Sequence, residues 1–424
     1  MTRDEECELV LAFARTLYVN GQGTELTLAA AQRLAGALGL RVNIGLRWAE
    51  LDVQREENGR PVWRTAAAPT GVHMNRVVAA MQALDDVMAG RLARDAARKE
   101  IDVIAIAPPA PTWMFALAAG VGALALAVIL GGAHPVDALI IFASAVLGAG
   151  LRRGLATVRA NAVAGPFCAS LLAGAVAAMA SRHGLISSLR LVAICPCLIL
   201  IPGSHVLNGA ADLISGRIHL GAARLIHAGL VMAAISTGLL LALVLFGVSL
   251  PIQEPVRAVA LWEDVIAAGV AVAAFCILFS MPLNMLAWPV AVGALAHALR
   301  WVAIMLDFSA AAGTLVACLM VGTILIPVAR RRRLPFAAIG FASVVSMIPG
   351  AYLLTMLAGL LQISRGEQTS LELISVTIAS GTTAMIIVLA IILGLIIPKM
   401  TMDYVDEKWS PSSKGEEDAV ARQR

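Results

Sequence analysis

Residues 112–132 read Thr-Trp-Met-Phe-Ala-Leu-Ala-Ala-Gly-Val-Gly-Ala-Leu-Ala-Leu-Ala-Val-Ile-Leu-Gly-Gly and contain no charged residue. A helix needs about 20 consecutive apolar residues to cross the roughly 30 Å of hydrocarbon in a bilayer, so this run is long enough to span a membrane. Similar runs follow, and we predict ten spans in all: 112–132, 135–150, 160–180, 185–203, 225–247, 264–281, 283–299, 306–328, 335–361 and 372–397. The predicted fold class is a polytopic all-α membrane protein.

The overall composition agrees with this prediction. Hydrophobic residues make up 59% of the chain and charged residues 14%, whereas a soluble domain carries about 25% charged residues to wet its surface. Mean hydropathy is +0.83. These values exclude a soluble enzyme, a fibrous protein and a disulfide-rich secreted scaffold.

The charged residues are concentrated at the two ends of the chain, with 27 in residues 1–110, 22 in 111–398 and 11 in 399–424. We therefore expect a small α+β cytoplasmic domain in residues 1–110 and a polar cytoplasmic tail in 399–424. Between them we expect a first five-helix membrane unit in 111–250 and a second in 251–398.

Periodicity in the first 110 residues predicts the elements of that domain. The expected helices are 8–19, 26–38, 74–89 and 91–106, and the expected strands are 41–48, 51–54 and 62–65. Asn58-Gly59 is a typical hairpin turn and is expected to connect the last two strands.

Arginines in the predicted loops indicate the orientation of the helices. With the N-terminal domain inside, nine loop or helix-end arginines lie on the cytoplasmic side and five on the external side. This bias follows the positive-inside rule and predicts that both termini are cytoplasmic.

An internal repeat links the two membrane units. Leu200-Ile-Pro202-Gly203 is echoed by Met347-Ile-Pro349-Gly350, at an offset of about 148 residues that also carries the first predicted span onto the sixth. Five spans is an odd number, so the two units are expected to have opposite orientations. Inverted repeats of this kind suit alternating access, with the substrate site near the middle of the membrane.

The segment 201–224 is the most unusual part of the first unit. Pro202-Gly203 is expected to interrupt the helix, and Pro349-Gly350 is expected to place a second break in the second unit. Backbone groups freed at membrane depth are tolerated where they line a cavity. Asn208 and Asp212 are four residues apart and share a helical face that can hold an ammonium group. A Pro-kinked helix that enters an ordinary loop is the alternative interpretation.

Charged and polar residues inside a bilayer are costly, and each is a candidate for function. Asp137 follows Pro135 and is either part of a pathway or a carboxylate favoured by a helix N-terminus. Asp307 is a candidate proton carrier with Arg300 as its nearest basic residue along the chain. His205 is either a proton relay or a packed polar side chain. The substrate and proton pathway candidates are Asp137, Pro202, Gly203, His205, Asn208, Asp212, Arg224, Asp307, Pro349 and Gly350.

Other classes of function have little support. The sequence contains no nucleophile elbow, zinc-protease motif or nucleotide-binding loop, so we expect no enzyme activity, no catalytic residues and no cofactor. The six cysteines lie mostly in apolar stretches and are expected to pack rather than bind metal. A net charge of +4 without a recognition motif argues against nucleic acid as a partner.

The chain resembles the threonine/serine exporter (ThrE-type) family over nearly its full length. The N-terminal half carries Gly21-Gln-Gly23-Thr-Glu-Leu-Thr-Leu and Arg33-Leu-Ala-Gly-Ala-Leu-Gly-Leu. The membrane half carries further motifs in the same order: Gly131-Gly132 with Asp137, Pro202-Gly203 with Asn208 and Asp212, Ser215-Gly216-Arg217, Gly221-Ala-Ala-Arg224, and Pro349-Gly350.

This resemblance implies export of threonine and serine, small amino acids, across the bacterial plasma (inner) membrane, driven by protons. Both membrane units would be fused in one chain, and self-association into a homo-oligomer is compatible with such a protein. Three alternatives remain open: an exporter of small dicarboxylates, a membrane-tethered enzyme with its site in residues 1–110, and a gated channel.

Overall fold

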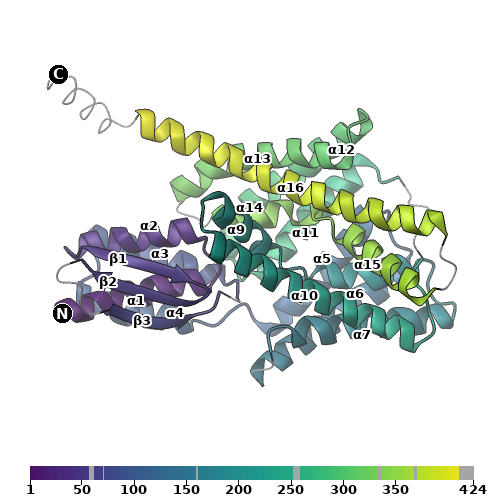
Figure 1. The fold of residues 1–424 in the computed structure, drawn as a ribbon, viewed down its shortest axis with the longest axis horizontal. Coiled ribbons are helices and arrows are strands. Elements are labelled where there is room, and N and C mark those ends of the chain that lie inside the picture. The colour runs from purple at the N-terminus through teal and green to yellow at the C-terminus, as the bar shows by residue number, and fades with distance from the viewer. Residues whose placement is uncertain are drawn as a thin grey trace.

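A computed structural model describes residues 1–409 except 57–61, 70, 159–160, 252–257, 333–335 and 367–369. Eight of its helices are long and apolar enough to cross a membrane, and two further pairs of shorter helices pass the same criteria as bent pairs, which makes up to ten spans. Figure 1 shows these helices as one bundle, with the N-terminal helices and strands gathered at one end. The fold is therefore mostly helical, with one small sheet.

The N-terminal region, residues 3–106, contains four helices and three strands. They are α1 (Arg3–Val19), α2 (Thr24–Ala37), β1 (Val42–Arg47), β2 (Ala49–Arg55), β3 (Val62–Ala67), α3 (Met74–Met88) and α4 (Arg94–Ile106). The strands form an antiparallel sheet in the order β1-β2-β3. All seven predicted elements are present, although Asn58-Gly59 lies outside the described residues. The tight β1–β2 turn, with Ala49 at a φ of +64°, was not expected from the sequence.

The first half of the membrane bundle follows a short linker. It contains α5 (Thr112–Ile129), α6 (Pro135–Thr157), α7 (Ala164–Arg182), α8 (Leu189–Leu198), α9 (Gly203–Ile214) and α10 (Ile218–Leu245). Pro135 is the first residue of α6, where a missing N–H costs nothing. The side chain of Ser188 caps α8 by accepting the N–H of Leu191 at 3.1 Å.

The second half repeats the same order of elements. It contains α11 (Leu261–Leu278), η2 (Leu283–Met285), α12 (Ala287–Met305), α13 (Ala310–Arg332), α14 (Phe336–Val344), η3 (Val345–Met347), α15 (Gly350–Arg365) and α16 (Leu371–Trp409). Each half thus has three spanning helices, a bent pair and one long final helix.

Packing between the helices also corresponds in the two halves. The third span packs extensively on the last in both halves, as α7 on α10 and as α13 on α16. The first spans, α5 and α11, pack on each other. The backbone N–H of Ala110, just before α5, donates to Ser280 Oγ, just after α11, at 3.0 Å, so the two helices run in opposite directions.

The fourth span of each half is broken at a Pro-Gly pair. Helices α8 and α9 meet at 57° around Pro202-Gly203, and the second pair meets at 52° around Pro349-Gly350. The sequence predicted both interruptions but ended the fourth span at residue 203 and began the fifth near 225. That placement is wrong, because α9 forms beyond the break and α10 already begins at Ile218.

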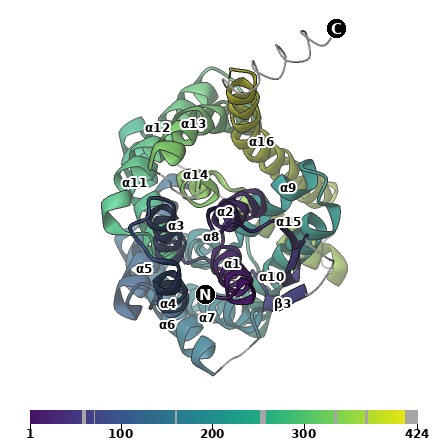
Figure 2. The same ribbon diagram turned by 90° about the vertical axis from the view of Figure 1, so that its left-hand side faces the viewer.

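The N-terminal region covers one end of the bundle. Seen from that end, α8 and α14 lie near the centre and the longer helices surround them (Figure 2). The start of α3 joins the bundle through its backbone, since the N–H groups of Met74 and Asn75 donate to the carbonyls of Phe279 and Ser280 at 2.8 and 3.1 Å. The region is therefore placed to influence what enters or leaves that end.

Candidate functional site

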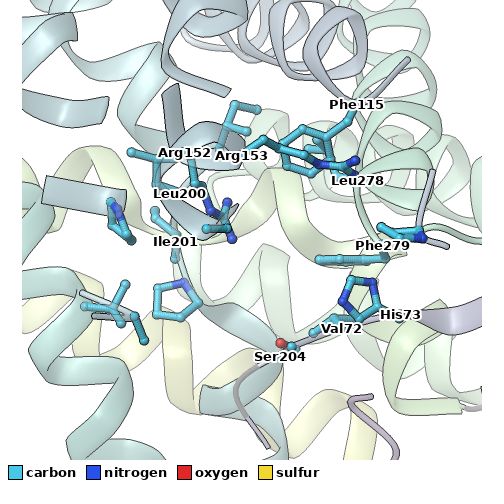
Figure 3. Close-up of a pocket in the computed structure, with 18 of the residues that line it drawn as sticks. Val72, His73, Phe115, Arg152, Arg153, Leu200, Ile201, Ser204, Leu278 and Phe279 are labelled. Carbon is cyan, nitrogen blue, oxygen red and sulfur yellow. The ribbon is translucent and has the colours of Figure 1, made fainter. Parts of the chain in front are cut away.

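A large cavity lies where the N-terminal region meets the bundle. This first cavity has a volume of about 800 Å³, enough for an amino acid and water. Its walls come from the segment before α3, from α5, α6, α10 and α11, and from the broken span at residues 199–205. Figure 3 shows Arg152, Arg153, Ile201, Ser204 and His73 around this space.

The charged lining of the first cavity is entirely basic among the described residues. It contains Arg152, Arg153, His73, His205 and His227, and no Asp or Glu. The guanidinium of Arg153 already has two contacts within the protein. Its Nη1 donates to the Ala110 carbonyl at 2.7 Å, and it lies 4.2 Å from the centre of the Phe115 ring. Arg152 makes no hydrogen bond or ion pair with another described residue and faces the cavity. A ligand with a carboxylate suits such a lining.

Two histidines of this cavity have unused polar atoms. Nδ1 of His73 and Nδ1 of His205 are buried and have no hydrogen-bond partner among the described residues. Burial, together with the nearby positive charge of Arg76, lowers the pKa of His73 to about 4, so its ring is neutral at ordinary pH. The ring of His205 lies edge-on to that of His227, with centroids 4.9 Å apart. These atoms can donate to or accept from a small polar ligand.

The break in the first half also frees backbone acceptors. The N–H of Gly203 donates to the Ile201 carbonyl at 3.0 Å, not to the Ile199 carbonyl four residues back, and Pro202 has no N–H to offer. The Ile199 carbonyl therefore loses its helical partner where residues 199–202 line the first cavity. Freed carbonyls of this kind can bind an ammonium group.

A second cavity of about 750 Å³ lies at the opposite end of the bundle. Its lining includes Pro135 of α6, Arg190 of α8 and Glu263 of α11. Helix α6 rises about 1.5 Å per residue, so Pro135 is about 26 Å from Arg152 in the first cavity. A narrow space of about 10 Å³ lies between the two, and it is lined by Ser144, whose buried Oγ has no partner among the described residues.

The two Pro-Gly breaks pack against each other's spans. A Cβ added to Gly203 would overlap the ring of Phe341 on α14, and a Cβ added to Gly350 would overlap Leu198 and Ile201 beside the first break. Each glycine is thus required by a close approach of the other broken span. The sequence predicted both breaks, and the structure brings Pro202, Gly203, Pro349 and Gly350 together between the cavities.

A different group of predicted residues meets the N-terminal region instead. Asp212 Oδ2 lies 3.0 Å from Arg224 Nε and accepts a hydrogen bond from Thr24 Oγ1 at 2.9 Å. Arg217 lies 3.8 Å from the other carboxylate oxygen. The side chains of Asp212 and Arg224 are 3% and 1% exposed, and the Arg224 Nε–H finds no aligned acceptor, so their contact is an ion pair.

Asn208 and Tyr18 complete this interdomain cluster of Tyr18, Thr24, Asn208, Asp212 and Arg224. Asn208 Nδ2 donates to the Gly21 carbonyl at 3.4 Å. The guanidinium of Arg224 lies 5.2 Å from the centre of the Tyr18 ring. Burial raises the pKa of Tyr18 to about 12, so the phenol stays protonated and donates to the Arg47 carbonyl. Thr24 and Tyr18 were not identified from the sequence.

The remaining two predicted carboxylates lie at the far end of the bundle. Asp137 is buried and accepts the N–H groups of Ser187 and Ser188 at 2.9 and 3.1 Å, and so fixes the segment that leads into α8. Asp307 is exposed in the turn between α12 and α13, with a φ of +63°. Neither lines a cavity described above.

The second half contains one buried polar chain that the sequence did not single out. His297 Nδ1 lies 3.0 Å from Asp264 Oδ2, and His297 Nε2 lies 2.7 Å from Ser346 Oγ. In the sequence, Asp264 resembles an ordinary first-turn carboxylate.

The fold and site thus define a polytopic membrane protein with two cavities at opposite ends and two broken spans that cross between them. Residues 8–246 match the family described as putative threonine/serine exporter, and residues 264–401 match a second family described as Threonine/Serine exporter, ThrE. The first match alone covers more than half of the chain, and the chain belongs to the threonine/serine exporter family. No curated protein and no solved structure matches it.

Proposed function

We propose that this protein is a secondary exporter of threonine and serine that works by alternating access. The observation that carries the proposal is the crossing of the two Pro-Gly breaks between cavities that open at opposite ends of the bundle. Broken helices at the junction of two inverted units are the arrangement found where secondary transporters bind substrate. The exporter family of both halves supports the same substrate class.

The first cavity is the substrate site in this proposal. The substrate carboxylate faces Arg152, the ammonium faces the freed Ile199 carbonyl, and the hydroxyl of threonine or serine faces Ser204 and His205. Access then switches to the second cavity when the broken spans move against each other past Ser144. Asp212, Asn208 and Arg224 hold the N-terminal region in place, and Asp137 holds the connection at the far end.

Orientation and coupling complete the proposal. The two halves form an inverted repeat, as the matching order of elements and the opposite directions of α5 and α11 support. The excess of loop arginines at the N-terminal end places that end in the cytoplasm of a bacterium, with the protein in its inner membrane. Export is driven by protons.

One observation favours a second substrate class. The first cavity has two adjacent arginines, three histidines and no carboxylate among its described lining residues. Such a lining also suits a small dicarboxylate, whose second carboxylate would face Arg153 or a histidine.

The test is a substrate panel in proteoliposomes loaded with labelled threonine, serine or succinate. Under an imposed pH gradient we expect faster release of threonine and serine. This acceleration should be lost in Arg152→Gln and little changed in Arg182→Gln, which alters the last residue of α7. Accelerated release of succinate alone would establish the dicarboxylate class. Equal, gradient-independent flux of all three would overturn the secondary transporter in favour of a channel.

A further inference from the structure

The buried chain of Asp264, His297 and Ser346, which we call the acid–histidine–serine chain, lies inside the second half. His297 is fully buried and Asp264 is 7% exposed. Both ring nitrogens of His297 are engaged, at 3.0 Å to Asp264 and at 2.7 Å to Ser346. Burying an ionisable pair in a membrane bundle is costly and is a marker of function.

Three elements contribute to the chain. Asp264 lies in the first turn of α11, His297 in α12, and Ser346 in η3, three residues before Pro349. Ser346 is therefore attached directly to the second break. Neighbouring Glu263 lines the second cavity, so the Asp264 end of the chain is the end closest to that cavity.

Few other ionisable groups face this chain among the described residues. Arg300, one turn beyond His297 on α12, is within electrostatic reach of Asp264, of Tyr352 on α15 and of Cys318 on α13. The Nε of Arg300 donates to Thr314 Oγ1 at 3.1 Å. From α14, Ser343 donates to the Pro289 carbonyl and so faces α12 without charge. Among the described residues, Arg300 is therefore a cation that acts on Asp264 from the same helix that carries His297.

We propose that the acid–histidine–serine chain is the proton site that couples the gradient to movement of the second broken span. This inference rests on the proposed secondary transport and adds the residues that carry the proton. A proton reaches the Asp264–His297 pair from the side of the second cavity. It binds to the His297 ring, and the Asp264 carboxylate balances its positive charge.

Protonation changes what Ser346 does. When the ring is neutral with its hydrogen on Nδ1, Nδ1–H donates to Asp264 and the Ser346 hydroxyl donates to Nε2. When the ring is charged, both ring nitrogens are donors, so Ser346 accepts from Nε2–H and its own hydrogen needs another acceptor. The hydroxyl thus reverses its role next to Pro349, where the backbone bends, and the two protonation states favour different arrangements of the break.

The same three groups also form the triad of a serine nucleophile, in which Ser346 would attack, His297 would act as the base and Asp264 would orient the histidine. Ser346, however, lines none of the three cavities described above, so none of them offers an acyl substrate a place beside its Oγ. Attack on a substrate is therefore the less favoured function, and it is an outcome that the experiment distinguishes.

The experiment compares net transport with exchange in proteoliposomes that contain the full chain. Net export of threonine under a pH gradient requires protons to be bound and released, whereas exchange of internal for external threonine at equal pH requires no net proton movement. For Asp264→Asn and His297→Gln we expect net export to fall by about tenfold or more, within the range of a typical coupling between two sites. Exchange should stay within about threefold of wild type, because substrate binding and access are retained.

Two further variants make the result decisive. Glu372→Gln removes an exposed carboxylate in the first turn of α16 and should leave both activities unchanged. Ser346→Ala keeps the contact between Asp264 and His297 and should shift the pH dependence of net export while exchange is retained.

Several results would contradict the proposal. If wild type shows no acceleration by a pH gradient, proton coupling itself fails. If wild type is accelerated and Asp264→Asn is accelerated equally, the chain is not the proton site. Loss of exchange together with net export in both Asp264→Asn and Ser346→Ala would assign the chain a structural role. Labelling of Ser346 by a fluorophosphonate would indicate a nucleophile and also overturn the proposal.

Discussion

The two halves of the membrane bundle share a scaffold but differ in where their polar groups lie. Both have three spans, a span broken at Pro-Gly and a long last helix. In the first half the break opens into a large basic cavity, and the polar side chains beyond it contact the N-terminal region. In the second half the break is attached to an internal acid–histidine–serine chain.

In the proposed mechanism, this difference separates a half that binds the substrate from a half that binds the coupling proton. A carboxylate ligand needs a basic, water-accessible cavity, which the first break provides with Arg152 beside freed carbonyls. A proton needs only a buried pair with a connection to one side, which Asp264 and His297 provide. Since the two breaks pack on each other at Gly203 and Gly350, we expect a movement of one broken span to displace the other.

The attachment of the N-terminal region shows the same contrast. To the first half it is joined by the buried Asp212–Arg224 pair with Thr24, and by Trp48, whose ring lies 5.2 Å from that of His227. To the second half it is joined by backbone hydrogen bonds of α3 and by an exposed ion pair between Lys399 and Glu25. The attachment to the first half thus depends on a few specific side chains, whereas the attachment to the second half depends on backbone hydrogen bonds and an exposed ion pair.

The largest effect is expected from breaking the first attachment. Asp212→Ala leaves Arg224 buried without a counter-charge, and such a loss costs about 3–5 kcal/mol. Lys399→Ala, at the exposed pair, should cost less than about 1 kcal/mol. Thermal unfolding of the purified protein measures both.

A double variant tests the cause of that loss. Asp212→Leu combined with Arg224→Met removes both charges and should recover much of the stability, because apolar replacement of a buried pair is often neutral. Equal losses in Asp212→Ala and Lys399→Ala would show that the two attachments do not differ as described.

The crossing of the breaks is tested by small additions at the two glycines. Gly203→Ala places a methyl group against the rigid ring of Phe341, whereas Gly350→Ala meets the ends of the more adaptable Leu198 and Ile201 side chains. Overpacking typically costs about 1–3 kcal/mol, and we expect Gly203→Ala at the upper end and Gly350→Ala at the lower. Transport should fall in the same order.

Gly229→Ala on α10 is the matched control, because nothing lies within 4 Å of an added Cβ there. It should leave transport unchanged and stabilise the helix slightly. If Gly203→Ala behaves like Gly229→Ala, the two breaks do not meet as closely as the structure shows.

The sequence was sufficient to predict the features that depend on local chemistry. Long apolar runs identified most of the spans, and Pro202-Gly203 and Pro349-Gly350 identified the breaks, because proline removes a backbone donor and the adjacent glycine relaxes the backbone. It also predicted the elements of the N-terminal region from their periodicity. The family matches confirm the resemblance found in short, ordered motifs.

The partners of the polar side chains could not be predicted in this way. Thr24 and Asp212 are separated by 188 residues along the chain, and nothing local to either indicates that they meet. Asp264 lies beside Glu263 in the first turn of α11, where carboxylates are favoured by the helix dipole alone. Only tertiary packing brings His297 and Ser346 to Asp264. The same packing distinguishes Asp264 from Asp307, which is exposed in a turn.

The smallest effect is expected from His73, where the N-terminal region forms a wall of the first cavity. Its pKa is lowered to about 4 in the folded protein, chiefly by burial, against an ordinary value of 6.5. Between these values the unfolded chain binds a proton that the folded protein does not, so the free energy of unfolding falls as the pH decreases from about 6.5 to about 4. Between pH 7 and pH 5.5 this one group lowers the free energy of unfolding by about 1.2 kcal/mol. Unfolding temperatures at pH 7 and pH 5.5 should therefore differ less in His73→Gln than in wild type. An identical difference in both proteins would mean that His73 is not held neutral between the N-terminal region and the first half.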